Sequence, residues 1–174
     1  TGIELQGGYV FTNWLNAVAN LSFSRNKVNS FTEYLDDYDA NWEWTGQVAV
    51  EHKKTDIAFS PSVVGAATLN ILPVKNLEIS LLGKYVGSQY LDNTQNDARK
   101  LNAFYTQDAR MILTLKNKLF KEWNIIGQVN NLFNKKYEPN GYTYSYVLDG
   151  ATIADNYYFP MAGTNFMAGV NIKL

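Results

Sequence analysis

The sequence of 174 residues contains no cysteine, and this absence excludes several kinds of site. Without thiols the chain has no disulfide scaffold, no thiolate metal site and no cysteine nucleophile. Histidine is almost absent as well, because His52 stands alone. A zinc site with several histidines is therefore excluded, and a Ser-His-Asp triad could use only this residue. We expect His52 to be a solvated loop residue, and we find no catalytic constellation, so the sequence does not predict an enzyme.

Long apolar runs and an excess of charge of one sign are also missing. Lys and Arg number 15 and Asp and Glu number 16, a net charge of -1 that gives no basic surface for nucleic acid. The sequence contains no stretch of about 20 apolar residues, the length that a transmembrane helix needs. The sequence does not start with a charged segment followed by an apolar one, the pattern that is typical of a signal peptide. Hydrophobic residues nevertheless make up 46% and aromatic residues 14%, which excludes a disordered chain.

Alternation of apolar and polar residues is the main signal that the sequence does contain, and it predicts β-strands. It is clearest near the end, where Phe166, Ala168, Val170 and Ile172 would share one strand face. We therefore predict an all-β fold, an antiparallel meander of about seven long strands with no helix longer than two turns. The expected strands are residues 2–6, 15–24, 63–71, 77–91, 105–116, 123–132 and 165–174.

The lengths of the strands and connections favour a segment of a larger transmembrane β-barrel. Tilted strands need about 9–11 residues to cross a bilayer, whereas strands of soluble proteins are commonly about 5–6. Short connections near 10–13, 72–76 and 117–122 alternate with long ones near 27–56, 92–103 and 134–162. Outer-membrane barrels have short periplasmic turns and long extracellular loops, which would put Leu174 on the periplasmic side. A soluble or surface-attached β-sandwich binding module is the alternative, because its strands alternate too.

The alternation also predicts which side chains face lipid and which face the inside of the barrel. The residues expected to face lipid are Leu15, Ala17, Ala19, Leu21, Leu77, Ile79, Leu81, Met111, Leu113, Phe166, Val170 and Ile172. The residues expected on the opposite, wet side are Asn16, Asn20, Ser80, Lys84, Asp108, Arg110, Asn171 and Lys173. Strands of transmembrane barrels alternate in this way between lipid and lumen.

Three sequence blocks resemble those of TonB-dependent outer-membrane receptors. Residues 130–137 (NNLFNKKY) resemble a signature near the end of these receptors. Residues 158–166 (YFPMAGTNF) look like the family's approach to its final strand, and residues 85–93 (YVGSQYLDN) are similar to an earlier strand end. Residues 138–146 look like those of receptors from the Bacteroidetes group. The order of the blocks makes the resemblance more specific than any one block, and it extends over essentially the whole chain.

The resemblance implies that residues 1–174 are the carboxyl-terminal segment of a receptor β-barrel, with the plug domain and the earlier strands absent. Such a receptor lies in the bacterial outer membrane, contacts its lipid and imports a scarce small-molecule nutrient when TonB pulls on the plug. Ferric siderophores, haem and cobalamin are the expected nutrients, ahead of oligosaccharides, and no cofactor is implied. A surface lipoprotein is a further candidate partner. Leu174 departs from the family, whose members commonly end in an aromatic residue.

Aromatic residues in the long loops are the candidates for contact with the nutrient. They are Tyr38, Trp42, Trp44, Tyr142, Tyr144 and Tyr146. The last three alternate along an extended ribbon, and Asp149-Gly150 favours a hairpin turn after it. Cross-strand packing that stiffens the loop is the alternative role for these rings. Asp36, Asp37 and Asp39 are weak calcium candidates, since closely spaced carboxylates suit that ion but the glycine of an EF-hand loop is missing.

Overall fold

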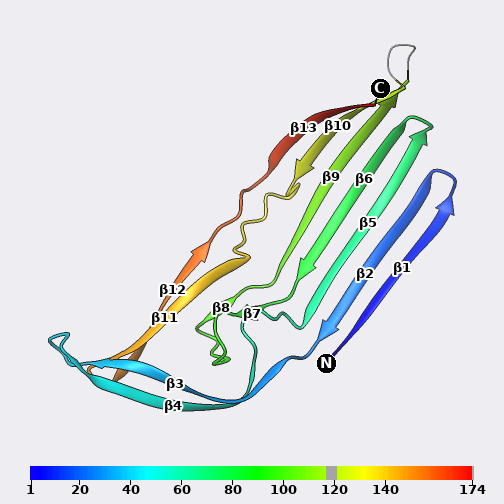
Figure 1. Ribbon diagram of the computed structural model, residues 1–174. Helices are drawn as coiled ribbons and strands as arrows, with labels where there is room; N and C mark the ends of the chain where they lie inside the picture. Colours follow the sequence, from blue (N-terminus) through cyan, green and yellow to red (C-terminus); the bar gives the residue numbers. More distant parts are fainter. Residues whose placement is uncertain (117–120, 174) are drawn as a thin grey trace.

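The computed structural model describes residues 1–116 and 121–173, and its regular structure is entirely β. Its largest sheet has seven strands, shown in Figure 1. In spatial order they are β1 (Gly2–Thr12), β2 (Leu15–Ser24), β5 (Val63–Val74), β6 (Leu77–Val86), β9 (Phe104–Leu115), β10 (Glu122–Asn130) and β13 (Asn165–Lys173). Every ladder between them is antiparallel, so the predicted meander of seven strands is confirmed.

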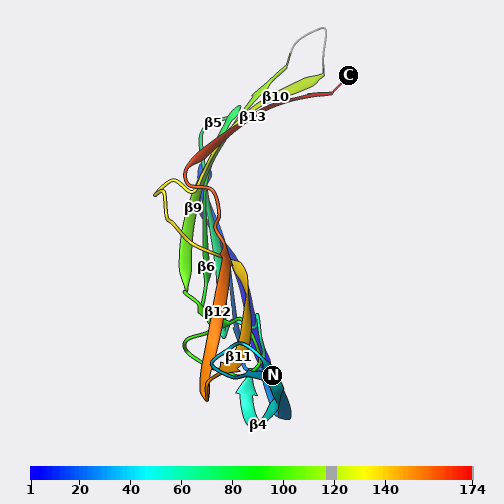
Figure 2. The same ribbon diagram turned by 90° about the vertical axis from the view of Figure 1, so that its left-hand side faces the viewer.

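The seven-stranded sheet is open and consists of one layer. β1 pairs with β2 and β13 pairs with β10, and within the described residues the two edge strands do not pair with each other. Seen from the side, the sheet is a thin curved layer, and no second sheet formed by residues 1–116 and 121–173 is stacked on it (Figure 2). The β-sandwich alternative requires two sheets that bury a shared apolar core. The observed architecture therefore does not fit that alternative.

Strand register gives the seven-stranded sheet one apolar and one polar face. Leu15, Ile71, Ile79 and Met111 are successive direct partners across four strands. One residue along, the row reads Asn16, Asn70, Ser80, Arg110 and Gln128. Direct partners lie on the same face of a sheet. The expected division of the strands into two shared faces is therefore confirmed.

Hydrogen bonds link the polar row across the strands. Asn70 donates through Nδ2 to Oδ1 of Asn16 at 3.0 Å, and the hydroxyl of Ser80 donates to Oδ1 of Asn70 at 2.8 Å. Ser80 is 1% exposed. Glu78, whose Oε1 lies 3.1 Å from the same hydroxyl, is 4.0 Å from Arg110 Nη2. These bonds satisfy polar groups within the sheet and fix the register of β2, β5, β6 and β9.

The apolar face lacks a protein core. Phe166 is 76% exposed and Val170 62%, and Leu5 and Ile172 are also exposed. Among the described residues, the buried apolar side chains are Leu35, Leu91, Leu101, Phe104 and Val147. A contiguous exposed apolar face of this extent marks a surface that meets a membrane or another protein.

A second sheet of four strands extends beyond one end of the first (Figure 1). Its order is β12 (Ala151–Phe159), β11 (Asn140–Leu148), β3 (Lys27–Tyr38) and β4 (Trp44–Asp56). The expectation that residues 27–56 form a loop is therefore wrong, whereas residues 134–162 contain the extended ribbon expected at Tyr142, Tyr144 and Tyr146. Each segment folds into a hairpin, and the two hairpins join through three parallel pairs, from Tyr146 opposite Asp36 to Leu148 opposite Tyr38.

The turn predicted at Asp149-Gly150 is confirmed. Leu148 pairs with Ala151, and the two turn residues have φ values of 48° and 76°. Positive φ at both central positions is what a two-residue hairpin turn requires, and Asp-Gly adopts it readily. The expected strand 77–91 instead ends at Val86, and a short pair, β7 (Gln89–Tyr90) with β8 (Lys100–Leu101), lies in the connection that follows.

Two expectations concern residues without a described structure. The connection at 117–122 includes residues 117–120, and the predicted last strand ends at Leu174; these five positions lie outside the described residues. Within the described part of the chain, no helix is long and apolar enough to cross a membrane.

Candidate functional site

The four-stranded sheet gathers aromatic side chains on one face, which we call the aromatic face. Because Tyr146 lies opposite Asp36 and β11 pairs with β12, side chains from three strands share this face. Trp44 joins them from β4 through the bond from its indole N–H to Asp36 at 3.4 Å, and Trp42 through its ring contacts. The aromatic face comprises Tyr34, Tyr38, Trp42, Trp44, Tyr142, Tyr144, Tyr146, Tyr157 and Phe159.

Four of the six aromatic candidates form one cluster. The ring centroids of Tyr38, Trp42 and Tyr146 are separated by 6.2, 6.3 and 5.8 Å, and Tyr144 lies 5.7 Å from Tyr146. Tyr142 stands outside the cluster, stacked on its cross-strand partner at 4.8 Å. Cross-strand packing therefore does occur.

The packed rings also remain accessible to a ligand. Trp42 is 60% exposed, and Tyr144 is exposed as well. Packing and ligand contact are therefore compatible roles for these residues. The rings hold one another in place while their outer surfaces stay open.

Two carboxylates lie among these rings. Asp36 accepts hydrogen bonds from Trp44 and, at 3.1 Å, from the amide of Gln47. Burial and then the neighbouring charges, Tyr144 and Asp36, raise the pKa of Tyr38. Burial and Asp155, which accepts a hydrogen bond from the phenol, raise the pKa of Tyr146. Both tyrosines are therefore neutral at neutral pH, in a locally negative field.

Asp39 shapes the turn that presents Trp42. Its Oδ1 accepts the backbone N–H groups of Asn41 at 2.8 Å and Glu43 at 2.9 Å, and these bonds lower the pKa of Asp39. Trp42 itself adopts a φ of 64°, in the left-handed region. A conformation that is uncommon for a bulky residue is thus held by a local carboxylate.

Two of the three calcium candidates accept hydrogen bonds within the protein. The Oδ1 atoms of Asp36 and Asp39 accept hydrogen bonds from protein donors, as described above. In residues 1–116 and 121–173, no group of three or more His, Cys, Asp or Glu side chains is arranged to hold a metal ion. Calcium binding at Asp36, Asp37 and Asp39 stays a prediction of the sequence and forms no part of the function proposed below.

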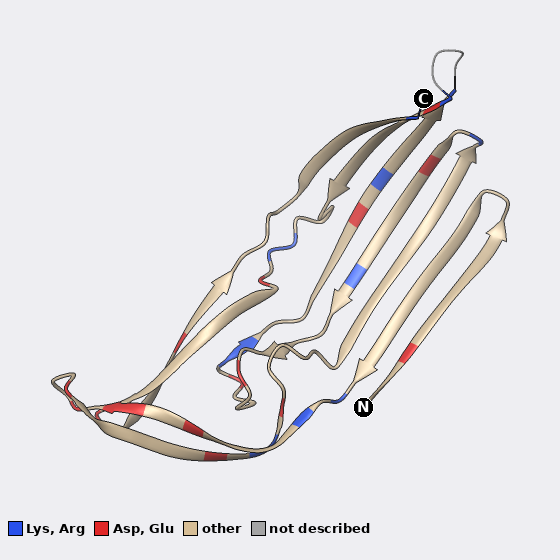
Figure 3. Cartoon of the chain, viewed as in Figure 1, with Lys and Arg blue, Asp and Glu red and all other residues tan. Residues whose placement is uncertain are grey.

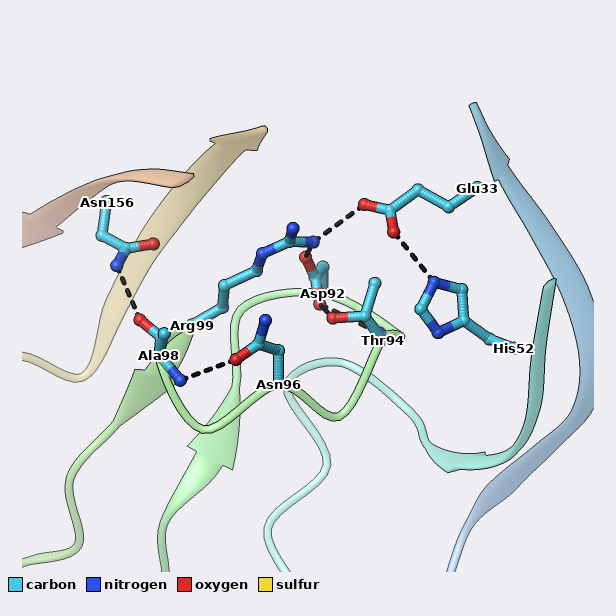
Figure 4. Close-up of polar contacts among 8 residues, drawn as sticks. All are labelled: Glu33, His52, Asp92, Thr94, Asn96, Ala98, Arg99 and Asn156. Carbon is cyan, nitrogen blue, oxygen red and sulfur yellow. Dashed lines mark hydrogen bonds and ion pairs between the residues drawn. The ribbon is translucent and has the colours of Figure 1, made fainter. Parts of the chain in front are cut away.

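The opposite face of the four-stranded sheet contains a buried ionic cluster, shown in Figure 4. Arg99 is 3% exposed, and its Nη1 lies 2.8 Å from Glu33 Oε1 and 2.8 Å from Asp92 Oδ2. Burial alone would lower the pKa of Arg99, but the bonds and charges of Asp92 and Glu33 outweigh it and raise the pKa. Glu33 belongs to β3, so the cluster ties the β7–β8 segment to the sheet.

His52 belongs to this cluster, and its expected place in a solvated loop is wrong. It lies in β4, where its Nε2 is 2.8 Å from Glu33 Oε2 and its ring stacks on Phe31 at 4.9 Å. The side chain of Asn156 in β12 also donates to the backbone carbonyl of Ala98 at 2.7 Å. Bonds from β3 and β12 thus hold the 92–100 segment against this side of the sheet.

Comparison with known proteins extends the description of the fold. Neither the protein-family models nor the curated protein sequences gave a match. Solved structures did. The siderophore receptor PiuA from Acinetobacter baumannii matches over 98% of this chain, with a TM-score of 0.65 and 15% identity. The ferric yersiniabactin uptake receptor FyuA from Yersinia pestis matches over 97%, with a TM-score of 0.61 and 18% identity. The ferric-catecholate import receptor Fiu from E. coli K12 matches over 98% of this chain, with a TM-score of 0.50 and 12% identity.

The chain spans about a fifth to a quarter of the length of these proteins, since it covers 21%, 22% and 27% of them. At such identities the likeness shows the fold. The chain has the fold of one segment of a much longer receptor chain, with the four-stranded sheet included in the match.

Proposed function

We propose that residues 1–174 form the carboxyl-terminal part of the β-barrel of a TonB-dependent outer-membrane receptor, with the plug domain and earlier strands supplied by further chain. The observation that carries the proposal is the single-layered meander with one apolar and one polar face, open at both edges. Added strands would close such a sheet, and lipid would cover the apolar face that no protein core covers. The fold match to siderophore and ferric-complex receptors supports it.

The dimensions of the strands agree with this placement. β2 and β6 have 10 residues and β10 has 9, within the range that a tilted strand needs to cross a bilayer, and β9 with 12 residues is long enough. The tight β1–β2 and β5–β6 turns lie at one end of the sheet and the four-stranded sheet at the other (Figure 1). On the barrel rule, the tight turns are periplasmic and the four-stranded sheet is extracellular.

The proposed activity is nutrient capture followed by import, without covalent chemistry. The aromatic face would contact the nutrient, and TonB would act through the plug to admit it. Ferric siderophores, haem and cobalamin remain the proposed nutrients, and the iron receptors with the same fold support the first. A surface lipoprotein and an origin in the Bacteroidetes group remain proposals that rest on the sequence resemblance.

Uptake by cells tests this function. Cells that lack the intact receptor should lose saturable uptake of one of the three nutrient classes, and an uncoupler of the proton gradient should abolish uptake in the wild type. Trp42→Ala with Tyr146→Ala should reduce uptake, because both rings belong to the cluster. Phe133→Ala removes an exposed ring that lies outside the four-stranded sheet, so uptake should persist. Uptake of all three nutrients that is unchanged without the receptor would refute the proposal.

A further inference from the structure

Charge is distributed unevenly over the molecule. The segments 28–52 and 137–159, which form nearly all of the four-stranded sheet, contain no lysine or arginine. Their acidic residues are Glu33, Asp36, Asp37, Asp39, Glu43, Glu51, Glu138, Asp149 and Asp155. Figure 3 shows the same imbalance, with acidic positions along this sheet and its tip. The net charge of the whole chain is close to zero, but the four-stranded sheet is acidic.

The nearby cations do not neutralise the aromatic face. Lys53 lies at the far end of β4, six positions beyond Gln47 and so roughly 20 Å along the strand, and its ammonium pairs with Glu51 at 3.1 Å. Arg99 lies beneath the other face and is shared by Glu33 and Asp92. Across the described ranges, Asp36 and Asp155 have no ion-pair partner.

Rings and carboxylates therefore occupy the same surface. Tyr146 lies directly opposite Asp36 across the β11–β3 ladder, and Tyr144 lies opposite Asp155 across the β11–β12 ladder. The face of an aromatic ring is negative, so tyrosine and tryptophan rings attract a cation placed over them. Ionised carboxylates attract the same ligand and repel an anion.

We propose that the aromatic face binds a ligand with net positive charge and a flat, ring-bearing body, and that it discriminates against anionic chelates of similar size. The inference rests on the proposed function in taking this face as the ligand-contact surface, but binding itself requires no transport. Among the proposed nutrients, the aromatic face would bind those that have a net positive charge.

A matched pair of dyes provides the test. The intact receptor that contains this chain is titrated in detergent, by calorimetry, with a tetracationic N-methylpyridinium porphyrin and with a tetra-anionic sulfonatophenyl porphyrin. The two probes share a flat ring system and differ in charge. We expect the cationic probe to bind at least tenfold more tightly at low salt, and the difference to shrink at 0.5 M salt because exposed charges are then screened.

Isosteric variants separate charge from shape. Asp36→Asn and Asp155→Asn keep an oxygen acceptor for Gln47 and Tyr146, and each should weaken the cationic probe about two- to fivefold. Trp42→Ala should weaken it about fivefold through the lost ring. Asp97→Asn is the control, because it removes one carboxylate whose side chain is 83% exposed outside the sheet, and affinity should not change. Heat-modifiable migration on gels confirms that each variant is folded.

Several results would overturn the inference. Equal or tighter binding of the anionic probe is one. Another is an Asp36→Asn, Asp155→Asn double variant that binds the cationic probe like Asp97→Asn. If charge selectivity holds but no nutrient uptake is found, the transport function fails and the inference stands. If uptake is intact and the probes show no charge selectivity, the inference fails alone.

Discussion

Leu81 and Leu82 offer a direct test of which face of the seven-stranded sheet meets lipid. They are neighbours in β6 and both are half-buried, but they point to opposite faces. Leu81 pairs with Leu69 and Ala109, on the apolar face. Leu82 pairs with Thr68 and Asp108, on the polar face. Arginine at the two positions therefore makes the same chemical change in two environments.

The expected costs differ widely. Arginine on the lipid face near the bilayer midplane destabilises a barrel by about 2–4 kcal/mol. Because about 1.4 kcal/mol is a tenfold change in an equilibrium constant, Leu81→Arg should shift folding roughly thirty- to a thousandfold. Leu82→Arg would lie opposite the carboxylate of Asp108 on the wet side. Its cost should stay below about 1 kcal/mol, since an exposed ion pair offsets part of the lost packing.

The assay is the loss of the heat-modifiable, folded form of the intact receptor in lipid vesicles as temperature or urea is raised. Leu81→Arg should unfold at clearly milder conditions than the wild type, and Leu82→Arg should unfold close to it. If Leu81→Arg is as stable as the wild type, or if Leu82→Arg is the less stable variant, the assignment of the lipid face is wrong.

Three further predictions follow from the same structure. Arg99→Met should lower the free energy of unfolding by about 3 kcal/mol and expose residues 92–100 to proteolysis, because it leaves Glu33 and Asp92 facing each other. Lys100→Met is the control: it removes an exposed pair with Asp97 and should change cleavage little. Folding lowers the pKa of Asp39, so the Asp39 carboxylate should stabilise its turn fully above the unfolded pKa of about 3.9 and lose this effect as the pH falls through the lower, folded pKa. Amide exchange at Asn41 and Glu43 should show this loss, and Asp39→Asn should abolish the pH dependence. Residues 1–174 expressed alone should aggregate instead of inserting as a heat-modifiable monomer, because β1 and β13 each leave an edge unpaired and unsatisfied backbone groups cost several kcal/mol in hydrocarbon.

The seven-stranded sheet could be predicted from the sequence because each of its strands has one apolar and one polar side. Alternation then persists over whole strands, as in the rows through Ile79 and Ser80. In β3 and β4 the same period exists, but both faces contain polar residues, and the segment length suggested a loop. The β3–β4 hairpin became visible only through its pairing, and so did the parallel contact of β11 with β3, which joins residues more than a hundred positions apart.

The ionic cluster could not be found from the sequence for a related reason. Glu33 and Arg99 are 66 positions apart, and His52 reaches Glu33 across the β3–β4 hairpin, which the sequence alone does not predict. Arg99 lies in a loop whose charges balance, with Asp92 and Asp97 against Arg99 and Lys100, so the sequence offers no signal that singles it out. The aromatic candidates were easier to recognise, because Tyr142, Tyr144 and Tyr146 alternate within a single strand.

The two sides of the four-stranded sheet explain how the aromatic face is held in a fixed shape. Leu35 and Val147 are buried on the side opposite the rings, and Leu91 and Leu101 are buried in the β7–β8 segment beside Arg99. A buried arginine shared by two carboxylates ties that segment to β3, so opening it would leave ionised groups without partners. The rings of Tyr38, Trp42 and Tyr146 therefore lie on a sheet whose opposite side is held by buried side chains and ion pairs. A ligand that meets an ordered surface loses less affinity to ordering of the protein, which favours selective binding at this sheet over binding at a flexible loop.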